Sequence, residues 1–162
     1  MPYSISTLLL RNLRDVFGEN DPVRRRAAID EIFHEDAVFY DPKGGVFRGR
    51  DEIDRIAGVI KATHPDFEYQ PLFPPEELGD AGRVRWVSGA PGKPPTYAGT
   101  DFIVARDGRI ASVYLCFRQP TVSRIVIAYA AADRATVPAA VRITSRTRSG
   151  WESIGTWLLS SS

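Results

Sequence analysis

The chain has 162 residues, of which 43% are hydrophobic and 25% charged, and its formal net charge is +1. This length suits one domain with a substantial core, and the small net charge gives no global attraction to nucleic acid. No apolar stretch is long enough to cross a bilayer. Cys116 is the only cysteine and His34 and His64 are the only histidines, so no intrachain disulfide can form and no metal site is expected. We therefore expect a cytoplasmic protein without a cofactor, a nucleic-acid partner or a membrane partner.

The first 63 residues carry helical spacings of apolar residues, interrupted by one short strand pair. Asp21 followed by Pro22 is a typical cap and first turn of a helix. Helices are predicted over residues 4–17, from Asp21 to about His34 and from Asp51 to about Thr63, and strands over Ala37–Asp41 and Val46–Phe47.

After His64 and Pro65 the apolar period changes from helical to alternating. Strands are predicted around residues 67–71 and 83–88, from Tyr97 to Ala105 and from Ile110 to Phe117. Helices followed by strands indicate an α+β fold, with three N-terminal helices packed on one face of a curved antiparallel sheet. Residues 118–162 contain six arginines, no lysine and twelve serines or threonines, so we interpret them as a basic extension to a domain of residues 1–117.

Two aspartates lie among apolar neighbours. Asp41 ends the run Ala37–Tyr40 and precedes Pro42, and Asp101 precedes the run Phe102–Ala105. A carboxylate in such surroundings is costly unless it is paired or protonated, so the two predict one acid–base pocket.

Each aspartate also has a purely structural interpretation. Asp41 could accept a hydrogen bond from its own turn. Asp101 could be satisfied by Thr100, Arg83 or Arg85.

The segments IFHEDAVFYDPKGGVFRGRDEI (residues 32–53) and GTDFIVARDGRIASVYLCF (residues 99–117) resemble the nuclear-transport-factor-2-like superfamily, which includes ketosteroid isomerases and SnoaL-like polyketide cyclases. The resemblance covers roughly residues 5–117. It implies a cone-shaped, cystatin-like α+β barrel with a pocket between helices and sheet, commonly as a homodimer.

Carried over by this resemblance, Asp41 matches the general base of the isomerase and Asp101 matches its protonated aspartate, which donates a hydrogen bond to the oxyanion. The isomerase also has a tyrosine on its first helix. Counting back from Asp21, that place falls at about Leu13, so a phenol would have to come from elsewhere, with Tyr40, Tyr97 and Tyr114 as candidates.

The resulting hypothesis is a cofactor-independent isomerase, cyclase or lyase acting on a small hydrophobic carbonyl compound, which Phe39, Trp86, Tyr97 and Tyr114 would contact. A non-catalytic ligand-binding or oligomerisation module is the main alternative. Epoxide hydrolysis, with an arginine (Arg83 or Arg85) between the two aspartates, is a further alternative. His64 is interpreted as a loop residue with a lesser prospect as a proton shuttle.

Overall fold

The computed structural model describes residues 3–118, so the extension predicted over residues 118–162 lies outside the described residues except for Arg118, the last residue of a strand. The helices are α1 (Ile5–Arg11), η1 (Asn12–Phe17), α2 (Pro22–Ile32) and α3 (Gly49–Thr63). The strands are β1 (Phe33–Tyr40), β2 (Val46–Arg48), β3 (Glu68–Pro71), β4 (Glu76–Leu78), β5 (Ala81–Gly89), β6 (Tyr97–Arg106) and β7 (Arg109–Arg118). No helix within residues 3–118 combines the length and the apolar character that a membrane span needs.

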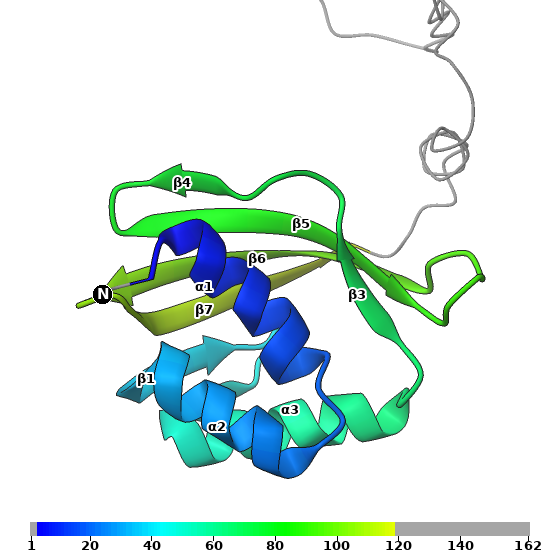
Figure 1. Cartoon of the computed structure of the whole chain (residues 1–162), viewed down its shortest axis with the longest axis horizontal. Coiled ribbons are helices and arrows are strands. Elements are labelled where there is room, and N and C mark those ends of the chain that lie inside the picture. The colour runs from blue at the N-terminus through cyan, green and yellow to red at the C-terminus, as the bar shows by residue number, and fades with distance from the viewer. Residues whose placement is uncertain (1–2, 119–162) are drawn as a thin grey trace, which may run out of the picture. The chain divides into compact units, whose positions relative to one another are not determined.

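All seven strands belong to one curved sheet with the order β2-β1-β7-β6-β5-β3, and β4 pairs with the other end of β5. The predicted α+β class is confirmed, with α1 lying against β5 and β6 and with α2 and α3 beyond it (Figure 1). Two details differ from the expected antiparallel barrel. The pair β1–β7 is parallel, and within the described residues the sheet stays open, with β2 and β3 as its edges.

The second helix ends two residues earlier than predicted. It stops at Ile32, and Phe33 has extended backbone angles and pairs with Ile110 of β7. Phe33 is fully buried, so its apolar character fits the end of a helix and the start of a buried strand equally well. The sheet pairing decides between the two.

The first helix is α-helical only as far as Arg11 and continues as the π-helix η1. The side chain of Ser4 caps its start by accepting a hydrogen bond from the backbone N–H of Thr7 at 3.1 Å. The same device starts α2, where Asp21 Oδ1 accepts from the N–H of Val23 at 2.8 Å. Each cap thus satisfies a backbone N–H group in the first turn of its helix.

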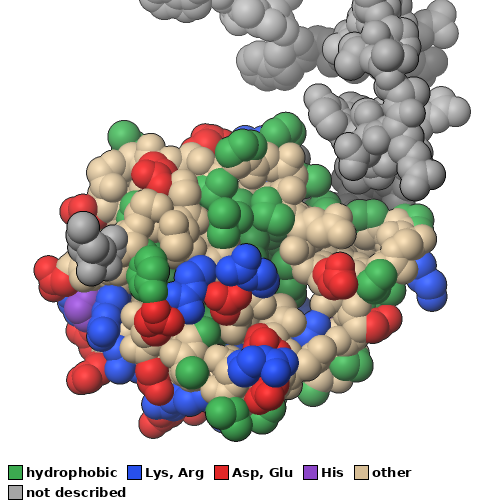
Figure 2. All heavy atoms as spheres, viewed as in Figure 1, with side chains coloured by type: hydrophobic (Ala, Val, Ile, Leu, Met, Phe, Trp, Pro, Cys, Tyr) green, Lys and Arg blue, Asp and Glu red, His purple; other side chains and the backbone are tan. Residues whose placement is uncertain are grey.

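Acidic and basic side chains alternate over the outer surface of the helices (Figure 2). Arg24 and Arg26 of α2 lie toward solvent, where they form ion pairs with Glu19 and Asp30. Arg25 does not, since it is only 8% exposed and binds Asp54 of α3 at 2.7 Å. Asp54 therefore compensates the charge of Arg25 where this arginine is buried between α2 and α3.

Candidate active site

A cavity of about 170 Å³ lies between the concave face of the sheet and the helices η1 and α3. Its volume is close to the roughly 150 Å³ of an apolar cavity that holds benzene. Apolar side chains from both layers form much of the wall, including Leu13, Phe17, Phe39, Ile60, Trp86 and Leu115. Seven side chains with titratable groups also line it, namely Asp41, Lys43, Lys61, His64, Tyr69, Tyr97 and Asp101. Both predicted aspartates therefore reach the same cavity.

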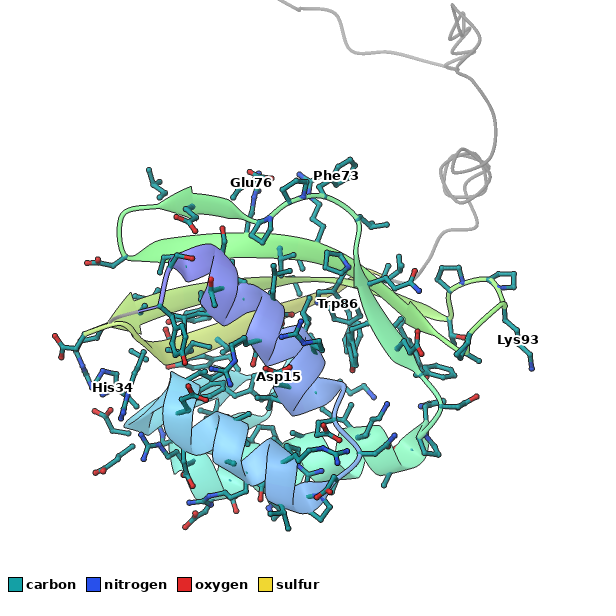
Figure 3. All side chains as sticks on the ribbon, viewed as in Figure 1. Asp15, His34, Phe73, Glu76, Trp86 and Lys93 are labelled. Carbon is teal, nitrogen blue, oxygen red and sulfur yellow. The ribbon has the colours of Figure 1, made fainter. Side chains whose placement is uncertain are left out.

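Asp101 is 4% exposed and points inward from β6. Trp86 Nε1 donates to its Oδ1 at 2.8 Å, and Asn12 Nδ2 donates to its Oδ2 at 3.0 Å. Figure 3 shows Trp86 projecting from β5 into the space between sheet and helices. Burial raises the pKa of Asp101 to about 6, and the two hydrogen bonds oppose that rise by favouring the ionised form. The salt-bridge interpretation is wrong, because Arg83 binds Glu76 at 2.6 Å and the partners of Asp101 are neutral.

Asn12 is a site residue that the sequence analysis missed. Its side chain is fully buried, and its Oδ1 has no hydrogen-bond partner among the described residues. It lies in the first turn of η1, and π turns of this kind occur often at functional sites. A signal was present, since Asn12 interrupts the apolar stripe formed by Leu8, Leu9 and Val16.

Asp41 both accepts a hydrogen bond within its own turn and lines the cavity, which were the two interpretations of its sequence position. Its Oδ1 accepts from the N–H of Lys43 at 2.7 Å, which closes the turn after β1, and its own N–H donates to Gly45 O at 2.8 Å. It is nevertheless half-buried and lines the cavity, and Oδ2 has no hydrogen-bond partner within residues 3–118. A carboxylate oxygen therefore remains available to a ligand.

Three of the four predicted substrate contacts, Phe39, Trp86 and Tyr97, line the cavity, and Tyr114 does not. The register of β7 explains this, because successive side chains of a strand point to opposite faces. Leu115 faces the cavity, so Tyr114 points to the outer face of the sheet, where its ring stacks on Tyr40 at 4.6 Å. Of the three tyrosines considered as sources of a phenol, only Tyr97 lines the cavity.

A phenol that the sequence analysis did not consider also lines the cavity. Tyr69, on β3, packs edge-on against the Trp86 ring with the centroids 4.9 Å apart. Desolvation and the nearby Asp101 charge raise the pKa of Tyr69 to about 12, so its hydroxyl stays protonated at neutral pH and can donate a hydrogen bond. The alternation of Phe67, Tyr69 and Pro71 places it on the inward face, but only the curvature of the sheet brings it beside Asp101.

His64, which was interpreted as a loop residue, lies at the candidate site. It ends α3 and stacks on Phe67 at 4.3 Å, and it lines the cavity.

Arg83 and Arg85 do not line the cavity, because the inward positions of β5 are taken by Val84 and Trp86. The Asp–Arg–Asp arrangement of the epoxide-hydrolase alternative is therefore not formed. No cluster of three potential metal ligands occurs in the described part of the chain.

Comparisons with known proteins agree with this architecture. The family model described as SnoaL-like domain matches residues 10–113. A candidate isomerase of the SnoaL-like family from Agrobacterium tumefaciens is 22% identical, with a TM-score of 0.65, over 70% of this chain and 97% of that one. A candidate polyketide cyclase from Sinorhizobium meliloti is 26% identical, with a TM-score of 0.53, over 68% of this chain and 94% of that one. No curated protein matches.

A third solved structure is a protein of Catenulispora acidiphila with a ketosteroid isomerase-like fold, in complex with trimethylamine. It is 17% identical with a TM-score of 0.54, and covers 72% of this chain and 86% of that one. At such identities the similarity supports the fold.

Proposed function

Because the chain belongs to the family of SnoaL-like domains, we propose that it is a cofactor-independent acid–base enzyme of the isomerase, cyclase or lyase type. Its substrate would be a small hydrophobic carbonyl compound. The observation that carries the proposal is Asp101, a buried carboxylate with a pKa near 6 on the wall of an apolar cavity. A general base works best when its pKa lies close to the working pH.

The hydrogen bonds of Asp101 favour a different division of labour from the one that the resemblance implies. Both of its oxygens accept from N–H groups, of Trp86 and Asn12, so the ionised form is favoured over a protonated hydrogen-bond donor. We therefore assign proton abstraction to Asp101. Asp41, half-buried and partly engaged in its own turn, is the second carboxylate and the alternative base.

The proposed reaction begins with transfer of a proton from the carbon next to the substrate carbonyl to Asp101. Negative charge then develops on the carbonyl oxygen, and a hydrogen-bond donor is needed there. The Tyr69 hydroxyl is suited to this role, since it lines the cavity beside Trp86 and has no hydrogen-bond partner among the described residues. Asp101 finally returns the proton to another atom of the enolate, which completes an isomerisation.

Deuterium exchange of one-ring ketones in D₂O tests the proposal without knowledge of the natural substrate. The protein is expected to accelerate exchange at the carbon next to the carbonyl, and Asp101→Asn to reduce that acceleration by about 10²-fold or more. Asp41→Asn is the matched control and should have the smaller effect. Exchange no faster than in buffer for a ketone that binds would favour the non-catalytic ligand-binding alternative, and a larger loss in Asp41→Asn would make Asp41 the base.

The expected homodimer is a second part of the proposal, and the outer face of the sheet supports it. Tyr114 and Phe102 are 41% and 40% exposed there, and their rings lie 6.3 Å apart next to Tyr40. Aromatic groups clustered on a surface commonly mark an interface. Light scattering should give twice the mass of one chain, and Tyr114→Glu should halve it. A wild-type mass of one chain would exclude the dimer.

A further inference from the structure

Lys61 is a nearly buried lysine on the cavity wall. It lies in the last turn of α3 and is 6% exposed. Its ammonium nitrogen Nζ donates to the backbone carbonyl of Phe67 at 2.6 Å, which uses one of its three N–H donors. Desolvation lowers the pKa of Lys61, as expected for a cation held away from water.

The charge of Lys61 has no close partner. Among the described residues no carboxylate lies within ion-pair distance of Nζ, and Asp66, Glu68 and Glu19 act on it only through longer-range attraction. Asp66 and Glu68 are exposed, and Glu19 already binds Arg24 at 2.9 Å. Lysine is almost never fully buried without a partner.

Arg25 is the informative comparison. It is about as deeply buried as Lys61, and Asp54 compensates its charge at 2.7 Å. Arg25 lies in the interface of α2 and α3, away from the cavity, whereas Lys61 lines the cavity. The buried cation without a carboxylate is thus the one that a bound molecule can reach.

Asp101 has the complementary property, since it is a buried anion with no cation among its partners. The two charges are on opposite layers, Lys61 on α3 and Asp101 on β6, and they do not pair with each other. The cavity therefore has a cationic side and an anionic side. A ligand with an anionic group and a separate acidic carbon would satisfy both.

We propose that the cavity binds a small carbonyl compound that carries a carboxylate, and that Lys61 Nζ binds this carboxylate. The proposal rests on the proposed function for the role of Asp101 and adds the substrate class. The two remaining N–H groups of Lys61 would donate to the carboxylate, while the apolar wall formed by residues such as Phe39 and Leu115 holds the carbon skeleton. The cavity volume of about 170 Å³ limits the skeleton to about one ring.

Benzoate is a suitable probe and benzamide is its neutral counterpart of nearly equal shape. Isothermal titration calorimetry on the wild-type protein should give a preference for benzoate of about 10- to 100-fold, the range expected for a hydrogen bond to a charged group. Lys61→Gln should abolish this preference and Lys61→Arg should largely keep it. Lys93→Gln is the matched control, because Lys93 is an exposed lysine at the tip of the loop between β5 and β6 (Figure 3).

Two results would overturn the proposal: equal binding of benzoate and benzamide by the wild-type protein, and a preference that survives in folded Lys61→Gln. If Lys61→Gln fails to fold, the side-chain NMR signal of Lys61 in the wild-type protein decides. That signal should move on addition of benzoate and stay in place with benzamide, and the opposite behaviour would refute the assignment.

Asp101→Asn separates this proposal from the proposed function. This variant removes the anionic side of the cavity, so it should bind benzoate at least as tightly as the wild type while losing ketone exchange. In the wild-type protein, ketone exchange without a benzoate preference would count against the carboxylate-bearing substrate alone. In the wild-type protein, a benzoate preference without ketone exchange would count against the enzyme alone.

Discussion

Replacing Asp101 with asparagine should stabilise the folded protein at neutral pH, and the structure gives the size of the effect. Burial raises the pKa of this carboxyl from its ordinary 3.8 to about 6. An acid whose pKa is higher in the folded state binds its proton more tightly there, so stability falls as pH rises from about 4 to about 6. Roughly two pKa units at 1.36 kcal/mol each correspond to a cost of about 3 kcal/mol above pH 7.

The surroundings of Asp101 can accept an asparagine without raising the number of unpartnered atoms on the Asn12 amide. The oxygen of the introduced amide would accept from Trp86 Nε1, in place of Asp101 Oδ1. Its NH₂ group would face Asn12, whose Oδ1 has no partner among the described residues. Rotation of the Asn12 amide would turn this oxygen toward the new donor and turn Nδ2 away from its present partner, so one atom of the Asn12 amide lacks a partner in either protein.

Urea unfolding of both proteins between pH 4 and pH 8 measures the difference directly. We expect Asp101→Asn to be more stable by up to about 3 kcal/mol at pH 8 and the difference to vanish near pH 4. Asp80→Asn, a loss of the same charge at an exposed position, should change stability little at either pH. A variant that is less stable than the wild type at pH 8, or a difference independent of pH, would refute the reasoning.

Three further variants test the same cavity. Trp86→Phe removes the donor to Asp101 Oδ1 and should raise the pKa of Asp101 above its wild-type value by about one unit, which NMR titration of the carboxyl carbon would show. Gly99→Ala places a Cβ 2.5 Å from Trp86 Cζ2 and should destabilise the fold by about 1–3 kcal/mol in urea unfolding, and an unchanged midpoint would contradict this. Tyr69→Phe should lower the rate of ketone exchange by about 10²-fold with little change in stability. Tyr40→Phe, at a position outside the cavity, should leave the exchange rate unchanged. Equal exchange rates in the two variants would remove Tyr69 from the mechanism.

The order of the helices and of the longer strands could be predicted because each of them repeats one spacing over several turns or pleats, whereas β4, three exposed residues long, was not predicted. The boundary at Phe33 could not, since a buried phenylalanine suits the end of a helix as well as a strand. Likewise, Asp101 was identifiable as a carboxylate in an apolar strand. Its position on the inner face depends on the register of β6 with β5 and β7, in which it lies opposite Val84 and Leu115.

The remaining site residues depend on long-range packing. In the sequence, Lys61 is an ordinary basic residue in the last turn of a helix. Because a lysine can cover apolar surface with its aliphatic chain and keep its ammonium in water, the sequence does not predict that Lys61 is buried. Tyr69 and Asn12 are far from Asp101 in the chain, so only the folded sheet shows their proximity. Tyr114 was predicted at the pocket from its residue type but lies on the outer face, because an aromatic side chain suits the outer face of a sheet as well as a pocket wall.

The π turn in η1 also affects how positions are counted along the first helix of this chain. A π turn holds one more residue than an α turn, so positions before it are offset by one when they are counted back from the end of the helix. Such counting from Asp21 arrives at Leu13, whereas the side chain that reaches Asp101 from this helix is Asn12. Deleting one residue of η1 would turn the preceding positions by about 100° around the helix axis. Helix length, and not composition alone, therefore determines which side chain meets the carboxylate.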